Sequence, residues 1–221
     1  MTNVAILIPA YNAASSLPQL LQQTARFIPA KSIIVINDGS KDETEPVAKK
    51  LSVVVLSHKN NQGKGAALQT GFDYALQNNF DAVITMDADL QHQPVDIERF
   101  LRLYEAKHYD IIIGSRLQNT KGMPLHRILS NTITTFLIRA RTGADISDSQ
   151  SGFRFITKRV LENVRLTSNG FESETEFLIK AASCGHTFGS LPIETIYAGE
   201  KSHMTHIQTT LYFIKVLFKQ Y

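Results

Sequence analysis

The chain has 221 residues, of which 43% are hydrophobic and 19% are charged, as in an ordinary globular protein with one substantial core. Its formal net charge of +3 is too small to indicate a nucleic-acid-binding protein. The single cysteine, Cys184, excludes an internal disulfide and favours a reducing compartment, and we expect it to fill apolar space in a helix.

No Gly/Ser-rich or Pro-rich linker and no internal repeat divides the chain, so we expect residues 1–221 to form a single domain. No run of about 18 apolar residues predicts a membrane-spanning helix. The start of the sequence also lacks the basic segment of a signal peptide. These features favour a cytoplasmic protein.

Apolar runs alternate with helical patterns through the first ninety residues. Short apolar runs bounded by polar residues predict strands at 4–8, 33–36, 53–56 and 83–86. Helices are predicted from Leu17 onward, at 44–51 and at 66–76. This alternation predicts an α/β fold with a Rossmann-like, mostly parallel sheet, helices on both faces, and ligands at the carboxyl ends of the strands.

Polar loops follow several of these strands at the edge where such a sheet binds ligands. Tyr11 and Asn12 follow the first strand, and residues 37–40 follow the second. Taken alone, each loop is explained by the preference of its residues for turns. Their shared position at the carboxyl ends of the strands favours a binding site. Lys64 lies between two glycines and can pair with a phosphate, although the spacings of a P-loop and of a GxGxxG motif are both absent.

Two carboxylates and an amide follow the fourth strand in the segment VITMDADLQHQP, residues 83–94. Asp87 and Asp89 are two residues apart, with Gln91 close behind. This oxygen-rich set suits Mg²⁺ or Mn²⁺ rather than zinc, and such ions keep positions open for substrate phosphates. For this motif taken alone, a solvated polar turn is the alternative.

A further strand is predicted at 110–114, and it leads to Arg116. An arginine at this edge suits bidentate binding of an anion, with a surface ion pair as the alternative. Residues 126–141 have the pattern of a basic amphipathic helix, with Ile128, Leu129, Thr132, Phe136 and Leu137 on its apolar side. Such a helix lies on a membrane surface or, more commonly, packs on its sheet.

Carboxylates recur in the next polar segments. Asp148 lies in DISDSQSGFR, residues 145–154, and would be the natural general base if the acceptor were a hydroxyl group. A loop turn is the alternative for Asp148. Glu172, Glu174 and Glu176 begin a predicted helix, where carboxylates interact favourably with the helix dipole.

The end of the chain contains a predicted strand, a loop and a helix. The strand is expected at 192–197. The loop at 199–206 carries Lys201, Ser202, His203 and His206. The basic amphipathic helix at 207–221 has three possible roles, which are docking on the domain, pairing with another subunit and contact with anionic lipid.

Taken together, the segments PAYN, NDGSKDET, NQGKGAALQTG, DADLQHQP and GSR have the order and approximate spacing of the family 2 glycosyltransferases, which the chain resembles over nearly its whole length. Within that family, DADLQH and DSQSGFR look most similar to the polyprenyl-phosphate (dolichyl- or undecaprenyl-phosphate) hexosyltransferases. The resemblance implies an A-type glycosyltransferase fold, and transfer of a hexose from a UDP- or GDP-linked nucleotide sugar to a lipid phosphate.

The resemblance also implies roles for individual residues. Base and ribose of the donor would contact Pro9, Tyr11, Asn12 and Asp38, with Lys64 and Gly65 beside them. The metal that bridges the donor diphosphate would be held by Asp87, Asp89 and Gln91. The acceptor phosphate would meet Arg116 and Arg127. One of Glu174 and Glu176 would face the active site, and His203 and Lys201 would lie near the diphosphate in a loop that closes over the donor.

The sequence departs from the family pattern in three places. Ala13 stands where the family often has glutamate after PAYN, which we expect to loosen a nucleotide contact, and Asn37 stands where it often has aspartate. No membrane helices follow the catalytic segment, although many relatives carry them. We therefore expect a protein that contacts the membrane peripherally, if at all.

We interpret the chain as a metal-dependent, inverting hexosyltransferase that acts by direct displacement at the anomeric carbon. A phosphate acceptor is already ionised near neutral pH, because its second pKa is about 6, so it needs positioning rather than a base. Three alternatives remain at this point. The first is transfer to a saccharide or protein hydroxyl with Asp148 as base. The second is a nucleotidyltransferase on a related sheet, which would normally carry a Gly-rich basic loop where this sequence has PAYNAASS, and the third is a non-catalytic nucleotide-sugar-binding protein.

Overall fold

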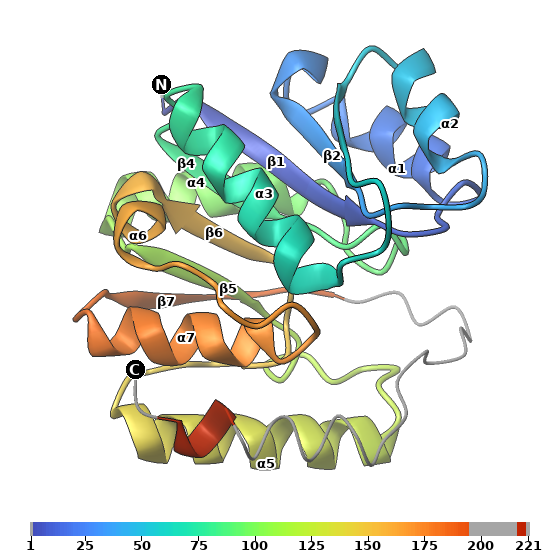
Figure 1. Ribbon diagram of the computed structural model, residues 1–221. Coiled ribbons are helices and arrows are strands. Elements are labelled where there is room, and N and C mark those ends of the chain that lie inside the picture. The colour runs from blue at the N-terminus through green and yellow to red at the C-terminus, as the bar shows by residue number, and fades with distance from the viewer. Residues whose placement is uncertain (1, 195–215, 220–221) are drawn as a thin grey trace.

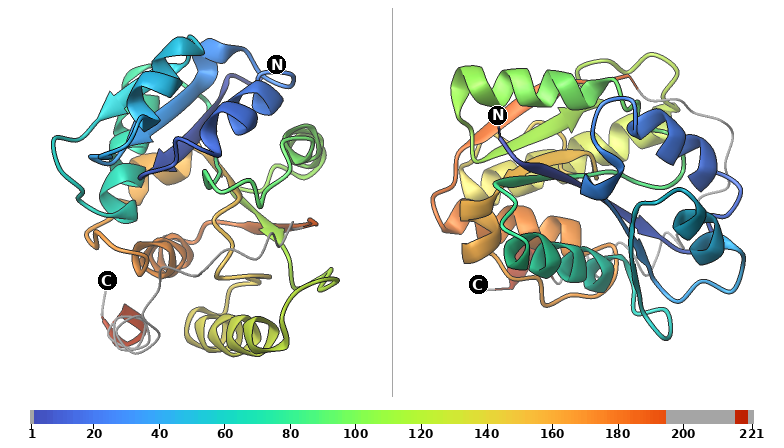
Figure 2. Two further views of the ribbon diagram at one scale, coloured as in Figure 1. Left: turned by 90° about the vertical axis from the view of Figure 1, so that its right-hand side faces the viewer. Right: turned by 90° about the horizontal axis from the view of Figure 1, so that it is seen from above.

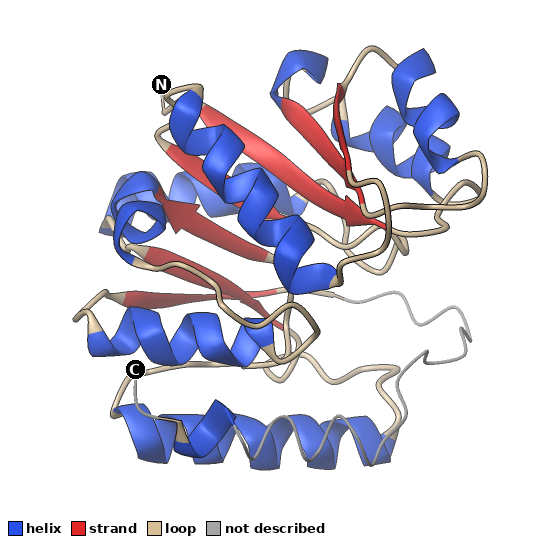
Figure 3. Ribbon diagram, viewed as in Figure 1, coloured by secondary structure: helices blue, strands red, loops and turns tan. Residues whose placement is uncertain are grey.

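A computed structural model describes residues 2–194 and 216–219. These residues form one seven-stranded sheet with helices on both faces (Figures 1 and 3). The strands are β1 (Val4–Ala10), β2 (Ile33–Asn37), β3 (Val54–Ser57), β4 (Ala82–Thr85), β5 (Ile111–Ser115), β6 (Arg154–Thr157) and β7 (Phe188–Pro192). The helices are α1 (Leu17–Thr24), η1 (Ala30–Ser32), α2 (Thr44–Lys50), α3 (Lys64–Gln77), α4 (Asp96–Lys107), α5 (Leu125–Thr142), α6 (Lys158–Asn163) and α7 (Ser173–Ser183).

The strands are ordered β3-β2-β1-β4-β6-β5-β7. β1 to β4 run parallel to one another, β5 is parallel to β7, and β6 runs antiparallel between β4 and β5. The mostly parallel sheet predicted from the sequence is thus confirmed. The carboxyl ends of β4 and β5 and the amino end of β6 meet at one edge, so Arg154 lies beside the residues that follow β4.

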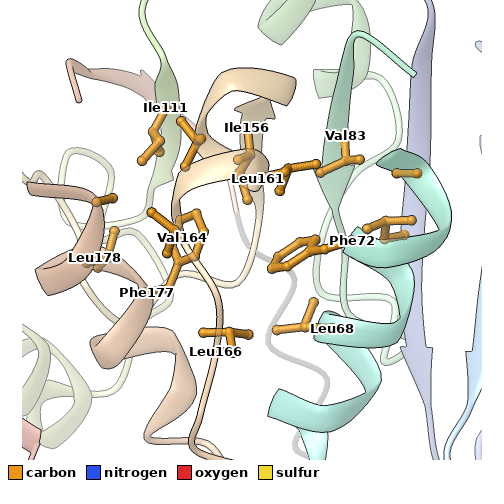
Figure 4. Close-up of a cluster of buried hydrophobic side chains, with 14 of the residues drawn as sticks. Leu68, Phe72, Val83, Ile111, Ile156, Leu161, Val164, Leu166, Phe177 and Leu178 are labelled. Carbon is orange, nitrogen blue, oxygen red and sulfur yellow. The ribbon is translucent and has the colours of Figure 1, made fainter. Parts of the chain in front are cut away.

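Two apolar layers hold the helices on the sheet. On one face, α3 packs over β1, β2 and β4, and α6 and α7 pack over β5 and β6, with the rings of Phe72 and Phe177 5.9 Å apart (Figure 4). On the other face, α1, α2 and α4 contribute side chains such as Leu20 and Phe100. Each such fully buried side chain stabilises the fold by roughly 1.5–3 kcal/mol. The rigid sheet fixes the loops at its carboxyl edge.

The last strand differs from its prediction. The expected strand at 192–197 is wrong, because β7 ends at Pro192 instead of beginning there, and residues 195–197 lie outside the described ranges. Its position is set by parallel pairing with β5, from Ile111 opposite Phe188 to Ser115 opposite Pro192. Because Gly189 and Ser190 interrupt the apolar pattern of β7, the sequence did not predict a strand at this position.

Two side-chain expectations also differ from the structure. Cys184 is exposed at the C-terminal cap of α7, so it fills no apolar space. Core packing of the predicted helix at 126–141 is observed only in part, because Ile138 belongs to the core while most of the apolar side faces outward. In α5 the buried side chains are Thr135 and Ile138, whereas Leu129 and Phe136 are 63% and 66% exposed. The helix forms an outer layer beyond α7 (Figures 1 and 2).

Part of the predicted C-terminal region lies outside the described residues. This holds for the loop at 199–206, with Lys201, Ser202, His203 and His206, and for most of the helix at 207–221. Val216 to Phe218 are helical. Within residues 2–194 and 216–219, no helix combines the length and apolar character needed to cross a membrane.

Candidate active site

The end of β4 positions the acidic motif. The backbone N–H of Met86 donates to the carbonyl of Leu7 at 2.9 Å, which extends the pairing of β4 with β1 to the residue before Asp87. The N–H of Asp87 then donates to Nδ1 of His92 at 3.3 Å, and the His92 ring stacks on Phe153 at 4.8 Å. A buried turn thus fixes the backbone that carries Asp87.

Lys64 joins Asp87 to a second carboxylate. Its Nζ lies 2.5 Å from Oδ1 of Asp87 and 2.7 Å from Oε1 of Glu174. Lys64 begins α3 and Glu174 lies in the first turn of α7, so two helices and one strand end meet at this point. The structure therefore brings together three residues that are far apart in the sequence.

Both members of the Lys64–Asp87 pair are charged near neutral pH. Burial alone would raise the pKa of Asp87, but the Lys64 ammonium, helped by Arg116, lowers it to about 2. Burial opposes the charged form of Lys64, yet Asp87 and Glu174 hold its pKa above the ordinary value. Burial lowers the pKa of His92, although Asp87 and Asp89 oppose this. His92 is therefore neutral and accepts the Asp87 N–H.

Arg154 and Gly152 form the back of this cluster. The Arg154 side chain is 3% exposed, and it donates to the carbonyls of Ser149 at 3.0 Å and Glu174 at 3.3 Å. Burial lowers the pKa of Arg154, while neighbouring carboxylates, led by Glu174, oppose that change. A Cβ on Gly152 would lie 2.9 Å from Oδ2 of Asp87, so a larger residue there would have to displace that carboxylate.

Arg116 and Asp148 form a second buried pair at the end of β5. Arg116 donates to the two carboxylate oxygens of Asp148 from Nε at 2.9 Å and from Nη2 at 3.1 Å. The backbone N–H groups of Arg116 and Gln150 donate to the same carboxylate, each at 3.1 Å. Asp148 is fully buried, so its carboxylate serves to orient Arg116 and has no exposed oxygen that could receive a proton from a hydroxyl acceptor.

Asp38 organises the loop that leads to Lys64. It is 3% exposed and accepts hydrogen bonds from the N–H groups of Gln62 at 2.9 Å and Gly63 at 2.8 Å. Nδ1 of His58 lies 2.7 Å from the same carboxylate. These contacts place Asp38 behind the loop, where it shapes the surface that Lys64 presents.

The remaining predicted donor residues line the neighbouring strand ends. Tyr11 is 47% exposed after β1. Asn12 has a left-handed backbone (φ 51°) and accepts the N–H of Lys41 at 2.8 Å, which ties the first loop to the second. Pro9 is half-buried in β1. Gly65 donates its N–H to the carbonyl of Asn169 at 2.7 Å, so it packs the start of α3 against another loop.

The residues present fit a magnesium or manganese ion. In the part of the chain that the structure describes, no group of three or more His, Cys, Asp or Glu side chains converges on one point. Asp87, Asp89 and Gln91 supply oxygen ligands, and Mg²⁺ is usually held by one or two carboxylates together with substrate phosphates. A cavity of about 450 Å³ opens beside Asp89 and His92, towards α1.

Other predicted residues have different positions. Of the two candidates in α7, Glu174 faces the cluster, whereas Glu176 accepts hydrogen bonds from the Thr167–Ser168 loop and pairs with Lys180 at 2.5 Å. Arg127 is half-buried in the first turn of α5.

Sequence reasoning assigned no role to Gly152, His92 or Arg154. The signals were present, because all three belong to the two motifs that carry the acidic residues.

Comparison with known proteins agrees with this geometry. The family model described as "Glycosyl transferase family 2" matches residues 5–165. The chain is 31% identical to UDP-N-acetylglucosamine–dolichyl-phosphate N-acetylglucosaminyltransferase of Methanococcus voltae, over 87% of this chain and 85% of the relative. It is 30% identical to polyprenol monophosphomannose synthase of Mycolicibacterium smegmatis, over 85% of this chain and 75% of the relative.

Solved structures share the fold. Glucosyl-3-phosphoglycerate synthase from Mycobacterium tuberculosis, crystallised with Mn²⁺, UDP and phosphoglyceric acid, superposes with a TM-score of 0.75 at 16% identity. The match covers 98% of this chain and 76% of that protein. This likeness supports the predicted A-type glycosyltransferase fold.

Proposed function

This chain belongs to glycosyl transferase family 2, and we propose that it moves a hexose from a nucleoside diphosphate sugar to a polyprenyl phosphate, with inversion at the anomeric carbon. The observation that carries the proposal is the pairing of Lys64 with Asp87 and of Arg116 with Asp148 at the same edge of the sheet. The first pair suits a metal-bound diphosphate, and the second suits an incoming phosphate. Relatives named for dolichyl- and polyprenol-phosphate acceptors support this choice.

Asp87, Asp89 and Gln91 would hold Mg²⁺ or Mn²⁺ at the donor. When bound, such an ion neutralises the charge that develops on the departing diphosphate. Lys64 lies beside the same carboxylate and supplies a further positive charge at this end of the site. The polar loops with Tyr11 and Asn12, shaped from behind by Asp38, would bind the nucleoside.

The geometry of Arg116 favours a phosphate acceptor over a hydroxyl acceptor. The hydrogen bonds from Nε and Nη2 of Arg116 to Asp148 keep the guanidinium in one orientation. Bidentate recognition of a phosphate requires such a fixed orientation. A phosphate is already ionised near neutral pH and needs no base. Asp148 is therefore best described as a positioning residue, while Arg127 would add a second positive charge at the acceptor.

Residues 1–221 would act as a single catalytic domain that works at the cytoplasmic membrane surface, where its lipid acceptor resides. The nucleotide base and the identity of the hexose are set by contacts in the donor pocket, which a panel of UDP- and GDP-sugars would distinguish.

Transfer assays test this function directly. The purified chain is incubated with each nucleotide sugar, polyprenyl phosphate, and Mg²⁺ or Mn²⁺, and the product is analysed by mass spectrometry and by NMR of its anomeric proton. We expect a lipid-linked hexose of opposite anomeric configuration to the donor, formed only with metal. Asp89→Ala should abolish transfer, whereas Glu98→Ala, which removes an exposed carboxylate on α4, should not. Turnover by a correctly folded Asp89→Ala protein with added metal would refute the proposal.

A further inference from the structure

The outward face of α5 is apolar. Leu125 is 82% exposed, and Leu129, Ile133, Phe136 and Leu137 continue the same face with exposed fractions of 63%, 49%, 66% and 37%. At 3.6 residues per turn these side chains fall within an arc of about 120° and extend over about 18 Å of helix. We refer to these five residues as the α5 stripe. Contiguous exposed apolar surface of this kind marks an interaction site.

The inner face of α5 is less apolar than the α5 stripe. The side chains buried against the protein are Thr135 and Ile138. A helix that only covered a core would place its leucine and phenylalanine side chains inward. In α5 the leucine and phenylalanine side chains point outward instead. This orientation indicates that the outer face of α5 contacts another apolar environment.

Positive charge borders the α5 stripe. Arg139 and Arg141 lie on the two sides of the arc, and both are exposed. Arg139 pairs with Asp145 at 3.0 Å, and Arg141 donates to the carbonyl of Lys219 at 2.7 Å. That second contact places the helical turn at 216–218 beside α5, where Phe218 adds a 75% exposed ring (Figure 2).

The same helix is joined to the acceptor side of the site. The N–H of Ser149 donates to Oγ1 of Thr135 at 3.0 Å, so the inner face of α5 holds the residue that follows Asp148. Asp148 in turn holds Arg116. The residue that contacts α5 is thus the direct neighbour of the carboxylate that orients the proposed phosphate-binding arginine.

We propose that the α5 stripe, with Phe218, Arg139 and Arg141, is the surface by which the enzyme docks on an anionic lipid bilayer. The apolar side chains enter the acyl boundary while the arginines face lipid phosphates, as in interfacial helices. A symmetric second copy fits this surface less well, because it would bring arginines towards arginines. The inference rests on the proposed function for its purpose, since docking there brings the lipid acceptor to the end of the site at Arg116.

Vesicle flotation tests the docking surface without using catalysis. The full chain is mixed with phosphatidylcholine vesicles, with or without phosphatidylglycerol, and with no acceptor or nucleotide sugar. We expect flotation with the anionic vesicles that weakens at high salt. Ile133→Asp and Phe136→Asp should each reduce the partition coefficient by about tenfold or more, because each apolar side chain removed from the bilayer loses its transfer free energy.

Val95→Asp is the matched control, because Val95 is 47% exposed against 49% for Ile133 but caps α4, on the other face of the sheet. It should float as the unaltered chain does, and circular dichroism should show all variants folded. Failure of the unaltered chain to float, or unchanged flotation of Phe136→Asp, would overturn the proposal. So would a dimer of the unaltered chain that Phe136→Asp converts to a monomer, since the α5 stripe would then join two copies. Because no transfer is measured, these results are independent of the proposed activity.

Discussion

Replacing Asp148 by asparagine keeps the size of the side chain but removes the charge that holds Arg116. The carboxylate accepts four hydrogen bonds at 2.9–3.1 Å, three from Arg116 and one from Gln150. An amide has one accepting oxygen instead of two, so about half of these bonds are lost and a buried guanidinium loses its partner. Removing one member of a buried pair costs about 3–5 kcal/mol, and the remaining bonds reduce this to about 2–4 kcal/mol.

For a chain of this size we expect the Tm of Asp148→Asn to fall by about 5–15 °C in calorimetry. In transfer assays the KM for the lipid phosphate should rise while the pH profile keeps its shape, since no proton passes through Asp148. A double-mutant cycle with Arg116→Gln should show a coupling of at least about 1 kcal/mol, because the two side chains act as one unit. Suppose instead that Asp148→Asn had the same Tm and acceptor KM as the unaltered chain, but that its activity no longer fell on one side of the pH profile. Asp148 would then be a general base, and the positioning argument would be refuted.

Two further substitutions test the packing around the site. Burial would raise the pKa of Glu176, but Lys180 and the hydrogen bonds from residues 167–168 lower it to about 2 from an ordinary 4.5, a difference worth ~3 kcal/mol. That stabilisation is present above pH 4.5 and is lost as the pH falls towards 2, so Glu176→Gln should lower the free energy of unfolding at pH 7 and flatten its acid dependence in urea titrations. Equal unfolding free energies at pH 7 would contradict this. Gly152→Ala places a methyl group 2.9 Å from Oδ2 of Asp87, and displacing that carboxylate should reduce kcat/KM about 100-fold. A variant with nearly unaltered kcat/KM would show that Asp87 tolerates the shift.

The sequence predicts those parts of the fold that local patterns determine. Central strands such as β1 and β2 are buried on both sides, so each is a continuous apolar run with a polar loop after it. β6 has no such boundary, because it follows a polar motif directly and is defined by antiparallel pairing with two strands that are distant in the sequence. Pairing between distant segments leaves no local trace, and this strand was therefore not predicted.

The same limit applies to side chains. Arg116 and Asp148 were each predicted as site residues, but their pairing across 32 positions emerges only when β5 and the loop before β6 meet at one edge. In α5 the periodicity correctly indicated an apolar side that includes Leu129 and Phe136. Periodicity says which residues share a face, and it does not say whether that face meets the core or another phase. The outward orientation of this face is therefore a property that only the folded chain reveals.

The charges of the described side chains around Asp87 nearly cancel before any ligand binds. They comprise three cations and four carboxylates, which are Lys64, Arg116, Arg154, Asp87, Asp89, Asp148 and Glu174. A divalent ion that arrives alone must compete with Lys64 for Asp87 and is repelled by the neighbouring cations. A nucleoside diphosphate brings negative charge of its own, so the ion and the diphosphate should bind with positive coupling.

We therefore expect Mn²⁺ affinity, measured by calorimetry or by electron paramagnetic resonance, to rise at least about tenfold when a nucleoside diphosphate is present, a coupling of about 1.4 kcal/mol. Lys64→Met should reduce this difference, because Asp87 then has no competing ammonium and the ion alone meets less repulsion. Arg165→Met, which removes an exposed cation paired with Asp73, serves as the control for a general change in charge. Mn²⁺ binding that is equally tight with and without nucleotide would mean that Lys64 does not compete for Asp87, and the charge-balance argument would fail.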